Sequence, residues 1–492
     1  MPRPSTQETR LLDAFAHGLR TNLILVLGSI AWWGCHFLLL WNADVATSDT
    51  VLAGYDGRFT LTVAGTVVAF GIVALIARVK PNLRLCRHPL TFIVYALCSI
   101  LALILVFAPL FTAEPMALVV FGALLSGMSN SLMLTVYGEL HGQLELRILP
   151  GLFALETGGG IVVFFLAGLA SAPIALAAAI ILVLGCTLLF LSAARASRSQ
   201  PILGSAEGAA RLDMGAGSLV ALAVLTGVGY GMVRTFIVGA EVANGAPTGI
   251  FFECAGTCLS VILLGAVFLL QRRLSLFELC LICVVAFVAT GLLLMSLNGT
   301  AALIPTVINQ GGFACFFVLI WYFAASLASR KGDRHLTFLI ALLLFASQLG
   351  QLLGALVPPQ FSNMLSTSLV YLILMASMGF MYSRSRRAAT LKDVAAGEIV
   401  ETAPLHPDGP SLNAIHAEMA SDRAWAQALG LSPREEEIAL LLLERTPYRN
   451  ISEQLFISEN TVKTHVRNIY KKAGVSSREE LLETLTTLTK KG

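Results

Sequence analysis

Charged side chains are scarce in this sequence. Only 13% of the 492 residues are Asp, Glu, Lys or Arg, against roughly 25% in a typical soluble protein. Hydrophobic residues make up 56% of the chain, so too few polar side chains are available to cover a water-soluble surface of this size. The shortage excludes a soluble enzyme and an intrinsically disordered chain, and it indicates a polytopic helical membrane protein.

Patterns typical of catalysis and metal binding are also lacking. No paired catalytic carboxylates, phosphate-binding loop or nucleophile motif stands out, so we expect no enzymatic activity. The nine cysteines all precede residue 316 and lie in or near apolar stretches, which excludes a disulfide-rich secreted module. Cys254 with Cys258, and Cys280 with Cys283, are close in sequence but have no His or Asp partner. We expect neither a metal site nor a cofactor.

Apolar runs long enough to cross roughly 30 Å of hydrocarbon recur as far as residue 382. We predict twelve spanning helices, at residues 22–41, 59–77, 90–111, 116–137, 148–170, 172–192, 218–240, 250–270, 274–297, 301–329, 336–357 and 363–382. The first run follows a polar stretch, is itself long enough to span and lacks a small-residue cleavage site. We therefore expect it to stay as a membrane anchor rather than to be removed as a signal peptide.

The loops between these runs differ in charge. If residues 1–21 are cytoplasmic, nearly all loop Lys and Arg residues fall on the inner side, for example Arg78, Lys80, Arg84 and Arg87, whereas the outer loops offer only Arg58. Lys and Arg are retained on the cytoplasmic side of membranes. The charge distribution predicts that both termini lie in the cytoplasm.

The longest inner connection, residues 193–217, is rich in small and polar residues and divides the spans six and six. The halves, 22–192 and 218–382, resemble in layout the two six-helix halves of the major facilitator superfamily. The loop at residues 77–84 lacks that family's Gly-rich signature with its Asp-Arg pair, which weighs against transport. The resemblance implies a transporter-like bundle of two six-helix halves, and the missing motif puts transport in doubt.

Four ionisable residues stand out within predicted spans, where charge is costly and often functional: Glu156, Arg234, Glu253 and, near the inner start of the span at 274–297, Glu278. In one interpretation Arg234 lines a cavity with Glu156 or Glu253 and favours an anionic or hydrogen-bonding small molecule. In the other, Arg234 and a Glu form a structural ion pair, and the glycines around them allow close helix packing. Both interpretations stay open from the sequence.

The composition changes abruptly after residue 387. Residues 383–428 are polar with several Pro and Gly residues, which predicts a cytoplasmic linker. About forty linker residues cannot hold a phosphate-accepting receiver domain, so a two-component response regulator is disfavoured. From residue 429 to 492 the pattern is helical, beginning at Ser432, Pro433 and Glu435, which together specify an N-cap, a first-turn proline and a capping box.

The third helix predicted in this tail, around residues 460–471, is amphipathic. Val462, Val466 and Ile469 recur at i, i+4 and i+7 and predict an inward stripe. The opposite face carries Asn460, Lys463, Thr464, Arg467 and Lys471. A face of Lys, Thr and Arg suits the DNA major groove, where Lys and Arg pair with guanine and the Thr methyl contacts thymine.

The segments LSPREEE, FISENTVKTHVRNIYKK and SSREEL between residues 431 and 485 resemble, in order and spacing, the four-helix LuxR/NarL-type DNA-binding domain of bacterial transcription factors. The resemblance implies base contacts from Lys463, Thr464 and Arg467. It implies DNA-backbone contacts from Thr461, His465, Lys471 and Lys472, with Glu435 supporting the fold. It also implies that the fourth helix exposes Leu481, Leu485 and Leu488 as a dimer contact.

The predicted class is all-α: a transmembrane bundle of about twelve helices followed by a small LuxR-type helix-turn-helix domain. The leading hypothesis is a membrane-embedded one-component transcription regulator that senses a small molecule or a membrane-associated signal. Its expected partners are double-stranded DNA, the lipid bilayer, an unidentified effector and a second copy of the chain, with RNA polymerase as a further candidate. The alternative is a major-facilitator-like secondary transporter, or a receptor that still transports its ligand, with an appended DNA-binding domain.

Overall fold

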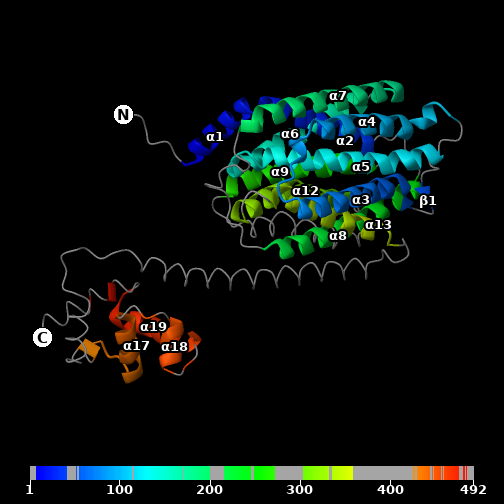
Figure 1. Cartoon of the computed structure of the whole chain (residues 1–492). Helices are drawn as coiled ribbons and strands as arrows, with labels where there is room; N and C mark the ends of the chain where they lie inside the picture. The colour runs from blue at the N-terminus through cyan, green and yellow to red at the C-terminus, as the bar shows by residue number, and fades with distance from the viewer. Residues whose placement is uncertain are drawn as a thin grey trace. The chain divides into compact units, whose positions relative to one another are not determined.

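The computed structural model divides the chain into two compact units, Met1–Ser385 and Arg386–Gly492 (Figure 1). We call them the membrane unit and the tail unit and describe each by itself. The structure describes residues 7–41, 51–52, 55–112, 116–168, 170–199, 215–244, 249–271, 303–331, 335–357, 425–426, 429–443, 446, 448–455, 457, 459–475, 480–481 and 484. The predicted spans at 274–297 and 363–382 lie outside these residues.

The membrane unit consists of long apolar helices. They are α1 Gln7–Thr21, α2 Leu23–Trp41, α3 Gly57–Val79, α4 Pro89–Val106, α5 Met116–His141, α6 Leu149–Gly168, α7 Ala172–Ala196, α8 Ala216–Asn244, α9 Gly249–Leu270, α12 Leu303–Lys331 and α13 Leu336–Ala355. Among the described residues, seven helices are long and apolar enough to cross a membrane, or eight if the bent pair α1 and α2 forms one span. Every predicted span within the described residues coincides with one of α2 to α13, and the membrane-bundle class is confirmed.

Two features were not predicted. A short antiparallel pair, β1 (Val51–Leu52) and β2 (Tyr55–Asp56), lies between α2 and α3, so the membrane unit is not purely helical. Residues before the first span form the amphipathic helix α1, bent by 81° from α2. The Phe15 ring of α1 lies 5.3 Å from the ring of Phe268 in α9, which anchors α1 to the bundle.

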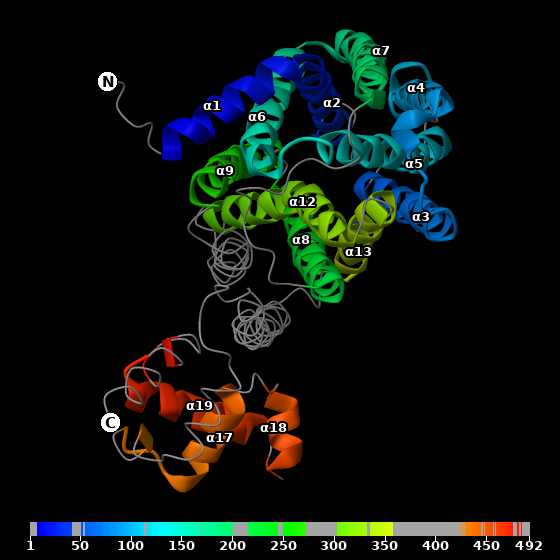
Figure 2. The ribbon, with the colours of Figure 1, turned by 60° about the vertical axis from the view of Figure 1, so that its left-hand side comes forward.

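The helices surround a common centre (Figure 2). Successive helices of a ring are in contact: α2 with α6, α6 with α9, α9 with α12, α12 with α13, α13 with α3, and α3 with α5. Helices α4 and α7 pack outside this ring. Large apolar side chains point outward, among them Leu75, Leu97, Leu166 and Ile181, each about two-thirds exposed. Such a surface suits hydrocarbon, and a helix satisfies its own backbone hydrogen bonds there. The described part of the membrane unit therefore has the surface of a membrane-embedded protein.

Helices α8 and α13 approach each other through glycines spaced four residues apart. A Cβ added to Gly227 of α8 would lie 2.3 Å from the carbonyl oxygen of Ser347, and one added to Gly350 of α13 would lie 2.2 Å from that of Val224. These are backbone atoms that cannot move aside without separating the helices. The glycines of α8 therefore serve close helix packing, as one sequence interpretation expected.

At the end predicted to face the cytoplasm, hydrogen bonds join the parts of the chain before and after residues 193–217. The Thr337 hydroxyl at the start of α13 lies 2.5 Å from Glu139 Oε1 of α5 and 2.7 Å from the Leu83 carbonyl. The buried Arg84 side chain reaches the same hydroxyl at 3.0 Å. Nearby, the Gln271 amide donates to the Arg147 carbonyl at 2.6 Å. These contacts hold this end of the bundle together.

The tail unit has its own hydrophobic core. Its described helices are α17 Pro433–Leu443, α18 Tyr448–Gln454 and α19 Glu459–Ala473. Ile438, Ile451, Val462 and Ile469 are fully buried and pack in one cluster. Trp425 belongs to the same cluster, so the folded unit begins before residue 429, where we expected it to start. Its position there follows from backbone bonds, because the Leu429 amide donates to the Trp425 carbonyl.

Candidate functional site

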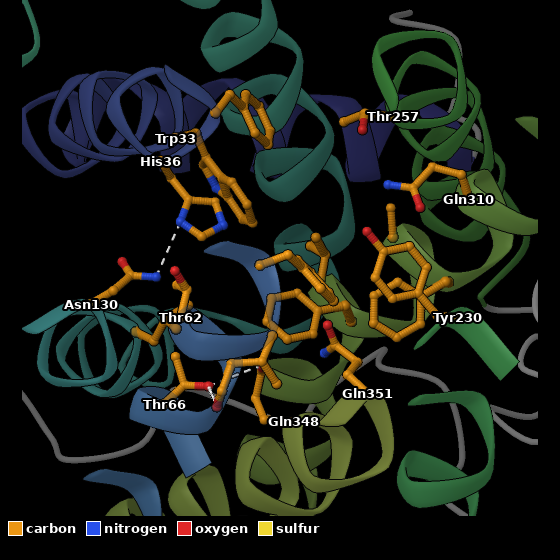
Figure 3. Close-up of a pocket in the computed structure, with 18 of the residues that line it drawn as sticks. Trp33, His36, Thr62, Thr66, Asn130, Tyr230, Thr257, Gln310, Gln348 and Gln351 are labelled. Atoms are coloured by element: carbon orange, nitrogen blue, oxygen red, sulfur yellow. Dashed lines mark hydrogen bonds between the residues drawn. The ribbon is translucent and has the colours of Figure 1, made fainter. Parts of the chain in front are cut away.

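A cavity of about 100 Å³ lies inside the membrane unit (Figure 3). It is lined by α2, α3, α5 and α6, which precede residues 193–217, and by α8, α9, α12 and α13, which follow them. A molecule in this cavity would touch helices from both predicted halves. The side chains in the cavity wall therefore determine which molecules the bundle can bind.

One side of the cavity carries a fixed polar arrangement around His36. The Trp32 indole N–H, which can only donate, points to Asn130 Oδ1 at 3.2 Å. The amide nitrogen of Asn130 therefore faces His36 Nδ1, at 3.1 Å. Since that nitrogen donates, Nδ1 accepts, and the hydrogen of the neutral imidazole sits on Nε2. His36 is thus held as a hydrogen-bond donor.

Two buried polar atoms of the cavity wall have no hydrogen-bond partner in the described part of the chain. They are Thr157 Oγ1 and Gln351 Nε2, on side chains that are at most 4% exposed. Leaving such a group unpaired costs about 1–3 kcal/mol. A small molecule or water in the cavity would recover that cost.

Aromatic rings form another part of the wall. The rings of Tyr230 and Phe313 stack at 4.1 Å with an angle of 8° between their planes. Figure 3 shows Tyr230 and Gln310 facing Trp33 and His36 across the cavity. Flat apolar rings beside polar groups are typical of pockets for small organic molecules.

The structure places Glu156 among hydrogen-bond partners away from the cavity wall. Glu156 is fully buried and is absent from the cavity wall in the described residues. Its carboxylate accepts a hydrogen bond from the Tyr137 hydroxyl at 2.5 Å and lies 2.9 Å from His141 Nε2. Because nearby partners of α5 satisfy this carboxylate, Glu156 has a packing role in place of the expected contact with a ligand.

Arg234 and Glu253 have different outcomes. The guanidinium carbon of Arg234 lies 5.0 Å from the centre of the Phe59 ring, a cation–π contact. Phe59 lines the cavity, but Arg234 itself does not. The Glu253 side chain lies outside the described residues, so an ion pair with Arg234 stays a prediction. The cavity-lining residues His36, Gln310, Gln348 and Gln351 were not predicted as site residues, because neutral polar residues within spans carry no charge that marks them.

The second candidate site is the exposed face of α19 in the tail unit. Val462, Val466 and Ile469 are buried, as the sequence periodicity predicted. Of the predicted DNA contacts, five are exposed: Thr461, Thr464, Arg467, Lys471 and Lys472. Lys463 and His465 are half-buried, and the Asn460 side chain lies outside the described residues. Helix α19 therefore presents a polar, basic face to solvent.

Lys472 is engaged within the tail unit. Its Nζ lies 2.6 Å from Glu435 Oε2 and 2.9 Å from the Gly430 carbonyl oxygen. The same carboxylate accepts from the Ser432 amide at 2.8 Å, and Ser432 Oγ accepts from the Glu435 amide, which completes the predicted capping box. Burial raises the pKa of Glu435, but the hydrogen bonds from Lys472 and Ser432 outweigh it, so the pKa is below its usual value.

The predicted dimer contact is partly contradicted. Leu481 is fully buried in the core of the tail unit, so our expectation that it is exposed was wrong. It packs in the same cluster as Ile438 and Val462. Leu485 and Leu488 lie outside the described residues, and their role at a dimer interface stays a prediction.

Comparison with known proteins matches both units. The membrane unit has the fold of the human organic anion transporter MFSD10, with a TM-score of 0.53 and 11% identity, over 73% of this chain and 99% of that one. It is similar also to the proton:xylose symporter XylE, with a TM-score of 0.51 and 12% identity, over 75% of this chain and 96% of that one. At such low identity the likeness shows the fold alone, and it confirms the major-facilitator-like architecture.

Residues 429–485 match the family model described as bacterial regulatory proteins, luxR family. The chain is 35% identical over 92 residues to the nitrate/nitrite response regulator protein NarL of Escherichia coli (strain K12), covering 18% of this chain and 40% of that protein. It is 40% identical over 50 residues to the spore germination protein GerE of Bacillus subtilis (strain 168), covering 10% of this chain and 68% of that protein. Through its DNA-binding tail domain, the chain belongs to the LuxR family of bacterial regulatory proteins.

Proposed function

We propose that this protein is a one-component transcription regulator of the bacterial inner membrane. A small molecule binds in the cavity of the membrane unit, and α19 binds promoter DNA from the cytoplasm. The observation that carries the proposal is the presence, in one chain, of a cavity lined by aromatic and polar side chains between two sets of helices and of a helix-turn-helix with an exposed basic face. Both roles are non-enzymatic.

The loop charges support the orientation. DNA is cytoplasmic in bacteria, and the predicted inner loops hold nearly all the loop Lys and Arg residues. One copy of a small helix-turn-helix binds DNA loosely, so we propose that two copies of the chain occupy two half-sites. RNA polymerase is the partner through which bound protein would change transcription.

The DNA contacts can be tested with a double substitution, Lys463→Ala with Arg467→Ala. It should abolish promoter occupancy in chromatin immunoprecipitation and the response of a reporter gene, because it removes the bidentate donors of α19. The control is Arg78→Ala with Lys80→Ala, which removes the same types of charge from an exposed site of the membrane unit. Unchanged occupancy in the α19 variant, at normal membrane levels, would refute the regulator.

Transport is the second candidate function, and the fold of the membrane unit is the observation that favours it. Proteoliposomes containing the full chain discriminate the two functions. A transporter accumulates its ligand or equilibrates it across the vesicle membrane, whereas a pure sensor binds it in proportion to the amount of protein. Retained reporter control without uptake supports the regulator.

A further inference from the structure

The wall of the cavity specifies the chemistry of its ligand, and this inference rests on the proposed sensing function. None of the described lining residues is Asp, Glu, Lys or Arg. An ionised molecule buried there would have no directly opposing charge, and an unpaired charge in a low-dielectric site is costly. The described wall therefore disfavours both anions and cations.

Hydrogen-bond donors face the cavity without matching acceptors. The Gln351 amide nitrogen is unpartnered in the described residues and can only donate. His36 is held with its hydrogen on Nε2 by Asn130. Thr157 adds an unpartnered hydroxyl that can donate or accept. A ligand that carries acceptors would satisfy these groups together.

Two further features narrow the class. Tyr230 and Phe313 are stacked beside these donors and offer flat apolar contact. The guanidinium of Arg234 lies on Phe59, outside the wall, so it supplies no direct ion pair to a molecule in the cavity. We infer that the cavity binds an uncharged, ring-containing small molecule with at least two hydrogen-bond acceptors.

Four probes of similar size separate charge from acceptor content. Nicotinamide is neutral with two acceptors, nicotinate is anionic, protonated 3-(aminomethyl)pyridine is cationic, and toluene is neutral without acceptors. Each is added to the full chain in lipid nanodiscs, and binding is read by saturation-transfer NMR against empty nanodiscs. Nicotinamide should give a signal about tenfold above that of each other probe, as expected from the loss of one or two buried hydrogen bonds.

Variants assign the signal to the cavity. Gln351→Leu and Thr157→Val should each weaken nicotinamide binding by about tenfold. They should also raise the melting temperature of the ligand-free protein, because each removes an unpaired buried polar atom. Gln143→Leu is the matched control: Gln143 also has an unpartnered buried atom but lies outside the cavity wall. It should leave nicotinamide binding unchanged.

The outcomes are distinct from those of the DNA experiment. Equal or stronger binding of nicotinate, equal binding of toluene, no probe signal above empty nanodiscs, or full nicotinamide binding by Gln351→Leu would each overturn the ligand class. None of these results bears on promoter occupancy, which is tested separately by substituting Lys463 and Arg467. Conversely, unchanged promoter occupancy in the Lys463 and Arg467 variant would refute the regulator. If nicotinamide still bound selectively, the neutral-ligand site would stand.

Discussion

The Nζ atom of Lys472 in α19 lies 2.6 Å from Oε2 of Glu435 in α17. The Glu435 side chain is only 6% exposed, and the same carboxylate caps the start of α17. One acidic residue therefore fixes both the first turn of α17 and the end of α19. This contact orients the helix that carries the predicted DNA-binding face.

Substitution Glu435→Gln should destabilise the tail unit by about 1–2 kcal/mol, because a charge-assisted contact and part of the capping box are lost. Since folding lowers the pKa of Glu435, its ionised form stabilises the fold fully above the ordinary carboxyl pKa of about 4.3 and loses this effect as pH falls through the folded value. Hydrogen exchange of α17 and α19 amides in the full chain measures both effects. A variant with the same acid sensitivity as the wild type would contradict this role.

Neighbouring lysines should behave differently on DNA. Lys471 is exposed, so Lys471→Ala should reduce the slope of log affinity against log salt by about 0.9, the value of one phosphate contact. Lys472→Ala should mainly lower the stability of the tail unit, because Lys472 is bonded to Glu435. Salt titrations with operator DNA separate the two, and equal slopes for both variants would contradict the assignment.

Close packing of α8 on α13 should be sensitive to one methyl group. Gly227→Ala places a carbon against backbone atoms and should destabilise the membrane unit by about 1–3 kcal/mol. Gly265→Ala is the control, since a Cβ at Gly265 of α9 meets nothing within 4 Å. That variant should be neutral or slightly stabilising. Thermal unfolding in nanodiscs compares them, and equal melting temperatures would refute the packing argument.

Substitution of the buried Glu156 should affect the stability of the membrane unit more than its binding of ligand. Glu156→Gln disturbs its contacts with Tyr137 and His141 and should cost about 3 kcal/mol or more. Folded protein should still bind nicotinamide as the wild type does, because Glu156 does not line the cavity. Saturation-transfer NMR on the remaining folded fraction tests this, and a selective loss of binding would return Glu156 to the ligand site.

Contacts at the predicted cytoplasmic end should control the unliganded state. Thr337→Val removes the hydroxyl that contacts Glu139 and Leu83, so reporter activity without ligand should shift toward the liganded level. Thr337→Ser keeps a hydroxyl at the same position and should behave as the wild type. If both variants match the wild type in reporter activity, these hydrogen bonds do not take part in signalling.

Local sequence patterns predicted the helices and the DNA-binding domain well, for physical reasons. A run of about twenty apolar residues is long enough to cross the hydrocarbon as a helix, and a helix satisfies its own backbone hydrogen bonds there. In the tail, Ser432 and Glu435 sit three residues apart, so their capping box follows from the sequence alone. The buried stripe of Val462, Val466 and Ile469 is equally local.

The sequence by itself determined the two-part organisation, the described spans and the LuxR-type domain, because these depend on hydrophobicity, periodicity and short motifs. Only the tertiary structure decided that Glu156 is satisfied by its neighbours, that Leu481 is buried, and that His36 and Gln351 share a cavity. The bonds of Glu156 join residues 15 and 19 positions apart on different helices, and the cavity joins His36 to Gln351 across the two halves of the bundle, so local periodicity predicts neither. Neutral polar side chains inside a bundle acquire a role only when packing decides which of their hydrogen bonds remain unmade.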